Sequence, residues 1–151
     1  MRIFQSFSSA ETKKLGYSLA RKIPRLRPRR NAIIVALAGE LGSGKTTFIQ
    51  GFFRGLGIRK RATSPTFIII RRFALCRKKF ANLYHIDAYR AGNPKEILKL
   101  DLAEIFIDPK NIVIIEWADK IRKIIPKDAI WIEFQHVMKK NERIIVLKKG
   151  V

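Results

Sequence analysis

The sequence predicts an α/β domain whose central sheet is mixed and partly parallel, with helices flanking the sheet. Two continuously apolar segments, 32–38 and 112–115, are typical of strands that are buried on both faces. Segments with helical spacing of apolar residues lie between the predicted strands. The chain has 151 residues, the size of one ordinary domain, so we expect a single domain over 1–151.

The first predicted element is a helix that begins at Ser8. The Ser8 side chain can cap free backbone N–H groups, and Glu11 completes a possible capping box. Pro24 should end this helix. Its apolar face repeats every four residues: Leu15, Leu19 and Ile23. Residues 21–30 follow as an expected exposed basic linker, either a solvated surface segment or a patch that contacts phosphates.

The later elements alternate in type along the chain. The apolar segment 32–38 predicts a central parallel strand, and 46–56 predicts a helix that Gly55 and Gly57 could stop. Residues 59–64 predict a basic loop, and the short connection between the strands predicted at 67–73 and 82–87 favours an antiparallel pair. The remaining elements are a helix at 94–106 and strands at 112–115, 129–134 and 143–147.

The composition narrows the classes of protein. Lys and Arg exceed Asp and Glu by 32 to 12, a formal net charge of +20, which indicates an anionic partner without choosing among nucleic acid, nucleotide, membrane and acidic protein. The apolar run 32–38 is far shorter than the ~18 residues of a membrane-spanning helix. No signal-peptide core is visible near the N-terminus, and Cys76 has no partner cysteine. We therefore expect a soluble, cytoplasmic protein.

One glycine-rich segment carries the chemistry. The sequence GELGSGKT directly follows the buried strand and has the spacing of a phosphate-binding loop. Gly39, Gly42 and Gly44 permit a tight turn whose backbone N–H groups face the phosphates, and the following helix directs its positive end at the anion. Lys45 can reach the β- and γ-phosphates, and the Thr46 hydroxyl can bind Mg²⁺.

Two carboxylates lie where such a site needs them. Glu116 directly follows the apolar strand 112–115, and Asp87 ends the strand 82–87. Ligands of open α/β sheets bind beyond the carboxyl ends of the strands, so both acids can hold Mg²⁺ or orient water. The alternative for either is an ordinary surface acid at a strand end. No Cys/His metal cluster competes with this site.

Four motifs together resemble one family. They are GELGSGKTT (39–47), SPTF (64–67), HIDAYR (85–90) and the pair Glu116 and Trp117. Their order and spacing are similar to those of the TsaE (YjeE) family of bacterial P-loop ATPases. The resemblance implies a P-loop NTPase-like three-layer fold. It also implies that ATP binding and hydrolysis support turnover of a TsaD–TsaB complex, which makes threonylcarbamoyladenosine in tRNA.

The resemblance also implies roles for individual residues. The catalytic residues would be Lys45, Asp87, Glu116 and Thr66, with Thr66 in a switch-like segment near the γ-phosphate. The metal would be held by Thr46, Glu116 and Asp87. The nucleotide would contact Gly39, Leu41, Gly42, Ser43, Gly44, Lys45, Thr46, Thr47 and Trp117. Glu40 and Ser43 stand where Asp and Ala are common in the family, and Ala118 and Asp119 replace a frequent Pro-Glu.

The expected cofactors are therefore ATP and Mg²⁺, and the expected partner is a TsaD–TsaB type complex, with possible tRNA contact through the basic surface. Two other interpretations stay open. A small-molecule kinase would share the phosphate-binding loop but need an acceptor pocket and a lid, which residues 59–61 imitate only in part. A basic nucleic-acid-binding protein could use the loop as a nucleotide sensor.

Overall fold

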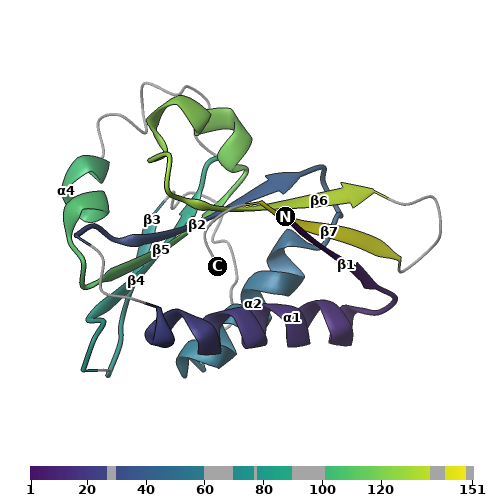
Figure 1. Ribbon diagram of the computed structural model, residues 1–151, viewed down its shortest axis with the longest axis horizontal. Coiled ribbons are helices and arrows are strands. Elements are labelled where there is room, and N and C mark those ends of the chain that lie inside the picture. The colour runs from purple at the N-terminus through teal and green to yellow at the C-terminus, as the bar shows by residue number, and fades with distance from the viewer. Residues whose placement is uncertain (27–29, 60–69, 77, 90–100, 137–141, 149–151) are drawn as a thin grey trace.

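The computed structural model describes the chain except for residues 27–29, 60–69, 77, 90–100, 137–141 and 149–151. The described strands form a seven-stranded sheet in the order β1-β7-β6-β2-β5-β4-β3 (Figure 1). The strands are β1 (Arg2–Ser6), β2 (Ile33–Gly39), β3 (Ile70–Ala74), β4 (Asn82–Asp87), β5 (Asn111–Glu116), β6 (Ile130–His136) and β7 (Arg143–Lys148).

Both kinds of strand pairing occur in this sheet, as the sequence predicts. β2 lies parallel to β5 and to β6, and β4 lies parallel to β5. The pairs β3–β4, β6–β7 and β1–β7 are antiparallel. The predicted central parallel strand and the predicted antiparallel pair are therefore confirmed.

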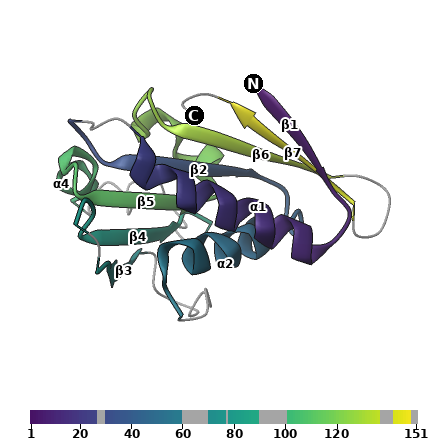
Figure 2. The same cartoon turned by 60° about the horizontal axis from the view of Figure 1, so that its bottom comes forward.

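Helices cover both faces of the sheet (Figures 1 and 2). One face carries α1 (Ser9–Lys22) and α2 (Lys45–Leu56); the other carries α4 (Leu102–Ile107) and the 3₁₀ segment η2 (Ala118–Ile124). Successive residues of a strand point to opposite faces. Leu37 accordingly packs in the apolar cluster beneath α1 and α2, while Ala36 belongs to the cluster on the other face.

The N-terminal helix begins after Ser8, as predicted, and ends at Lys22, two residues before the predicted stop at Pro24. The backbone N–H of Glu11 donates to the Ser8 hydroxyl at 3.1 Å, and Glu11 Oε2 accepts from the backbone N–H of Phe7 at 2.7 Å. After Lys22 the chain enters a 3₁₀ turn, η1 (Ile23–Arg25), that contains Pro24. Residues 21 and 22 are thus helical, so the start of the predicted basic linker is wrong. Their charges instead complement the negative end of the helix.

Glycines let α1 approach α2 closely. A Cβ atom on Gly51 would lie 1.9 Å from the backbone oxygen of Lys13, and one on Gly16 would lie 2.1 Å from that of Phe48. Gly57 ends α2 with a φ of 86°, as predicted, whereas Gly55 lies inside the helix against Ala20. The proposed stop at Gly55 is wrong because this glycine makes room for a neighbouring helix.

Three elements were not predicted from the sequence: β1 and the 3₁₀ segments η1 and η2. β1 is an edge strand with mostly exposed side chains, so it lacks a clear apolar pattern. Several other boundaries differ: the described helix of the segment 94–106 is α4, the strand predicted at 67–73 begins within the described residues at Ile70, and the strand predicted at 129–134 extends to His136. No helix of the described part of the chain is long and apolar enough to cross a membrane.

Candidate functional site

The loop between β2 and α2 depends on left-handed glycines. The φ angles are 140° at Gly39, 75° at Gly42 and 104° at Gly44. A Cβ atom on Gly39 would also lie 2.5 Å from the backbone oxygen of Phe134 in β6. Other residues rarely adopt such φ angles, so these glycines allow the chain to wrap tightly at the carboxyl end of β2.

The first turn of α2 presents backbone donors. Gly44 precedes the helix and provides no side-chain cap. The first N–H groups of a helix have no partner within the helix, and the helix dipole adds positive potential there. The loop and this helix end together form a suitable cradle for a phosphate group.

Lys45 is folded back onto this loop. Its Nζ donates to the backbone oxygens of Gly39 at 2.8 Å and Glu40 at 2.7 Å, and it lies 3.8 Å from the centre of the Trp117 ring. The residue is only 4% exposed. Burial lowers the pKa of Lys45, and the carboxylates of Glu116, Asp119 and Asp87 oppose this shift.

Glu116 is held by two side chains from other elements. Its Oε2 accepts a hydrogen bond from the Thr46 hydroxyl at 3.1 Å, and its Oε1 lies 2.9 Å from His85 Nε2. Both Glu116 and His85 are buried, and the His85 ring packs edge-on against Phe53 with 5.6 Å between ring centres. The carboxylate is thus fixed beside the first turn of α2.

Asp87 lies next to Glu116 because β4 and β5 are parallel and in register. The two residues are direct partners in the strand pairing, and the backbone N–H of Ala88 donates to the Glu116 carbonyl at 3.0 Å. Asp87 Oδ1 accepts from the backbone N–H of Tyr89 at 3.1 Å. The adjacent strands β2, β5 and β4 therefore bring the glycine loop and both predicted carboxylates to one edge of the sheet.

Trp117 has an unusual backbone conformation at this edge. Its φ is 57° and its ψ is 40°, and it is the one non-glycine residue with positive φ in the described chain. Its ring contacts Tyr89, with 4.8 Å between centres, as well as Lys45. Lys120 Nζ lies 4.6 Å from the Tyr89 ring. Since such conformations persist where their surroundings hold them, these contacts fix Trp117 over the loop.

The donor set suits a hard cation such as Mg²⁺. The described residues contain no group of three or more His, Cys, Asp or Glu side chains placed to hold a metal by themselves. Mg²⁺ is usually bound through one or two carboxylates together with phosphate oxygens and water. The Thr46 hydroxyl and the Glu116 carboxylate converge at 3.1 Å, with Asp87 on the adjacent strand, so these oxygens fit that mode of binding.

The other predicted site residues have different outcomes. Ser43 is buried, and its Oγ lies 3.4 Å from Lys45 Nζ; Leu41 is 78% exposed; Thr47 lies in the first turn of α2. Thr66, with the rest of the segment 64–67, lies outside the described residues.

Three contributors were missed from the sequence: His85, Tyr89 and Arg143. The alternation of strand residues places His85 on the same face as Asp87, a signal that could have indicated it. Arg143 Cδ and Nε lie 2.7 Å from where a Gly44 Cβ would stand, which brings the start of β7 against the loop. Nothing local in the sequence indicates that approach, because it depends on the position of β7 in the sheet.

Comparisons with known proteins identify the family to which the chain belongs. Residues 6–145 match the family model "Threonylcarbamoyl adenosine biosynthesis protein TsaE". Curated proteins named tRNA threonylcarbamoyladenosine biosynthesis protein TsaE are similar to the chain: the Bacillus subtilis protein is 37% identical over 66% of this chain, and the Treponema pallidum protein is 30% identical over 75% of this chain and 80% of its own length.

The extent of these matches varies. The aligned part spans 59% of the Bacillus subtilis relative and 64% of the Haemophilus influenzae relative. The crystal structure of Bacillus subtilis YdiB is similar over 97% of this chain and 83% of that chain, with a TM-score of 0.71 and 29% sequence identity. The similarity of structure therefore extends over nearly the whole of this chain.

Proposed function

Because this chain belongs to the TsaE family of tRNA threonylcarbamoyladenosine biosynthesis proteins, we propose that it binds and hydrolyses ATP with Mg²⁺. The observation that carries the proposal is the convergence of Lys45, Thr46 and Glu116 at the glycine loop. A phosphate cradle, a lysine and carboxylates next to it are the parts that phosphoryl transfer from a nucleotide requires.

Lys45 acts on the phosphates. In the described conformation its ammonium group donates to the carbonyls of Gly39 and Glu40. An ATP phosphate offers a negatively charged acceptor in place of these neutral ones, so Lys45 turns toward the nucleotide. The ammonium group is charged in both arrangements, but only the phosphate adds Coulombic attraction between opposite charges, which favours the exchange.

Thr46, Glu116 and Asp87 hold the metal and position water. A bound Mg²⁺ neutralises charge that develops on the phosphate oxygens. The Thr46 hydroxyl supplies one oxygen ligand, and Glu116 and Asp87 supply carboxylates for the metal or for the attacking water. His85 keeps Glu116 in place through the 2.9 Å contact. Fixed orientation of these groups is a main source of catalysis in such reactions.

The proposed cellular role follows the family. ATP hydrolysis by this chain would support repeated turnover of a TsaD–TsaB type complex in the cytoplasm, and the excess positive charge would favour contact with tRNA. Phosphate neutralisation by Lys45 requires one positive side chain, whereas the formal net charge of the chain is +20. Most of this charge is therefore available for a polyanionic partner.

ATP hydrolysis tests the proposal directly. The rate is measured for the chain alone, then with a TsaD–TsaB complex, and then with tRNA. We expect Lys45→Ala to abolish nucleotide binding, and Glu116→Gln to reduce hydrolysis far more than binding. Glu104→Gln on the exposed side of α4 is a matched control that should retain the full rate.

Two outcomes would contradict the proposal. Unchanged hydrolysis in both site variants would remove the assigned mechanism. A rate of ATP hydrolysis that stays the same when the protein complex and tRNA are added would contradict the proposed cellular role. Labelled γ-phosphate distinguishes the product, because transfer to a metabolite in place of release as free phosphate would identify a kinase.

A further inference from the structure

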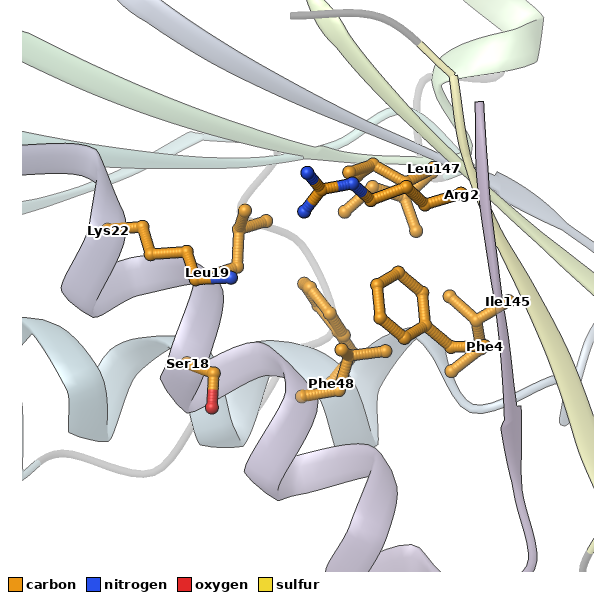
Figure 3. Close-up of a pocket in the computed structure, with 10 residues that line it drawn as sticks. Arg2, Phe4, Ser18, Leu19, Lys22, Phe48, Ile145 and Leu147 are labelled. Atoms are coloured by element: carbon orange, nitrogen blue, oxygen red, sulfur yellow. The ribbon is translucent and has the colours of Figure 1, made fainter. Parts of the chain in front are cut away.

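A cavity lies away from the glycine loop, between α1 and the strands β1, β7 and β6. Its volume is about 220 Å³, and its lining is mainly apolar, with Phe4, Leu19, Phe48 and Leu147 among the residues (Figure 3). β1 and α1 are consecutive in the chain and diverge from the turn between them (Figure 2). The cavity is thus space that the divergence leaves unfilled.

Two positively charged side chains lie at the solvent side of this cavity. Arg2 from β1 and Lys22 from α1 are the exposed members of the lining, and both extend over the cavity in Figure 3. The lining contains no acidic residue. Within the described residues, neither side chain has an ion pair or a hydrogen bond. The entrance therefore has positive potential that an anionic group would neutralise.

The adjacent edge of the sheet is available for pairing. β1 is the last strand in the sheet order, so its outer edge has no partner strand among the described residues. Three apolar side chains in or beside β1 are strongly exposed: Met1 at 86%, Ile3 at 63% and Phe7 at 59%. Soluble proteins usually protect such edges, because an exposed strand edge readily pairs with another chain.

We propose that β1 and this cavity form a docking site for an extended acidic segment of a partner protein. The segment adds as a strand to the free edge of β1. One of its bulky apolar side chains enters the cavity, and carboxylates two residues to either side meet Arg2 and Lys22. In strand addition, main-chain hydrogen bonds supply affinity, and pockets for alternate side chains supply specificity.

The charge of the chain argues for this occupant over two others. A second copy would bring a net charge of +20 to an entrance that is already positive. RNA would satisfy the charges, but single-stranded RNA is usually bound by stacking bases on exposed aromatic rings. The aromatic side chains of this cavity, Phe4 and Phe48, are half-buried and buried, and Phe7, exposed at 59% beside β1, offers a single ring where stacking of successive bases needs several.

A synthetic peptide tests the site in the full chain. The probe is a dye-labelled peptide with the core Glu-Val-Phe-Val-Glu, in which the Phe and both Glu side chains share one face when extended. We expect saturable binding by fluorescence anisotropy. Three matched peptides have Lys in place of Glu, Ser in place of Phe, or Pro in place of Val. Each should bind at least about tenfold more weakly, a loss of about 1.4 kcal/mol in binding free energy.

Variants of the protein assign the binding to this surface. The double variant Arg2→Glu/Lys22→Glu should weaken binding at least about tenfold. The control variant Lys110→Glu/Lys123→Glu makes the same change of net charge at exposed positions elsewhere. It should change the affinity for the peptide less than about twofold. Leu147→Phe should fill the cavity and exclude the apolar side chain. Thermal melting and nucleotide binding of each variant show that the fold and the loop are intact.

Several results would overturn the proposal. Equal losses in the two double variants would show binding to net charge alone, and undiminished binding of the proline peptide would exclude strand addition. Tighter binding of polyuridylate than of the peptide, dependent on Arg2 and Lys22, would identify an RNA site instead. These measurements need no ATP hydrolysis, so failure here and failure of the proposed ATPase function are distinguishable.

Discussion

At the scale of the residue, Lys45 is a buried and closely held charge of the candidate site. It is 4% exposed, and its Nζ contacts two carbonyls and the Trp117 ring. Desolvation disfavours its charged form, while nearby carboxylates favour it. A bound nucleotide would add further negative charge. The pKa of Lys45 should therefore be higher in the complex than in the free protein.

This difference in pKa predicts a pH dependence of nucleotide affinity. Because burial lowers the pKa of Lys45 from 10.5, the free protein loses this proton as the pH rises through the lowered value. The complex retains it, so affinity should fall over the range from that value up to the pKa in the complex. Titration calorimetry with an ATP analogue measures this fall.

Lys45→Arg is the matched control, because arginine stays charged over the whole range. The variant should bind the analogue with little pH dependence in the same interval. An equal decline of affinity in wild type and Lys45→Arg would show that another group titrates.

A second prediction at the residue scale concerns the support that His85 gives to Glu116. It contacts Glu116 at 2.9 Å and touches the apolar core through Phe53. Removal of this support should lower kcat of ATP hydrolysis about 10- to 100-fold, the range seen for groups that orient metal ligands, with a smaller change in KM. The variant is His85→Leu, measured by steady-state hydrolysis.

His85→Gln separates orientation from packing, because glutamine can still hydrogen-bond to Glu116. It should recover part of kcat. If His85→Leu and His85→Gln lose the same activity, or if only KM changes, His85 does not position Glu116.

At the scale of the element, the contact between α1 and α2 determines where the loop lies. α2 carries the loop at its first turn, and α1 packs along it through Gly16 and Gly51. A Cβ on Gly51 would meet backbone atoms of Lys13, which cannot move as a flexible side chain can. Glycine at this position thus serves the packing of two helices.

We therefore expect Gly51→Ala to be destabilising although alanine favours helices. Overpacking should lower the free energy of unfolding by about 1–3 kcal/mol or more, against a gain in helix propensity of about 1 kcal/mol. Urea denaturation measures the difference. Arg54→Ala, on the exposed side of the same helix, should change stability by less than about 0.5 kcal/mol. An unchanged free energy of unfolding in Gly51→Ala would show that α1 can move away from α2 without loss of stability.

At the scale of the whole molecule, strand order assembles the site. The glycine loop, Asp87 and Glu116 are far apart in the sequence, yet they lie at the carboxyl ends of strands that are neighbours in the order β2-β5-β4. Parallel strands end at the same edge of a sheet, so their following residues meet there. β1, the first strand in the sheet order, is not one of these three strands, and it carries the proposed docking surface.

Much of the site could be predicted because its signals are local. The spacing from Gly39 to Thr46 specifies a tight loop, and the position of Glu116 after an apolar strand specifies a strand end. The contact of His85 with Glu116 and the approach of Arg143 to Gly44 join elements that are distant in sequence. Such contacts depend on register and strand order, which local patterns do not contain.

By itself the sequence determined the kind of sheet, the tight glycine loop and the two carboxylates at strand ends, because hydrophobic periodicity and glycine spacing act over a few residues. Tertiary structure alone decided the presence of β1, the role of Gly55 and the cavity beside Arg2 and Lys22. The physical reason is that an edge strand, a close helix contact and a cavity each depend on how elements pack against one another. That packing joins residues that are distant in the sequence, so local patterns do not contain it.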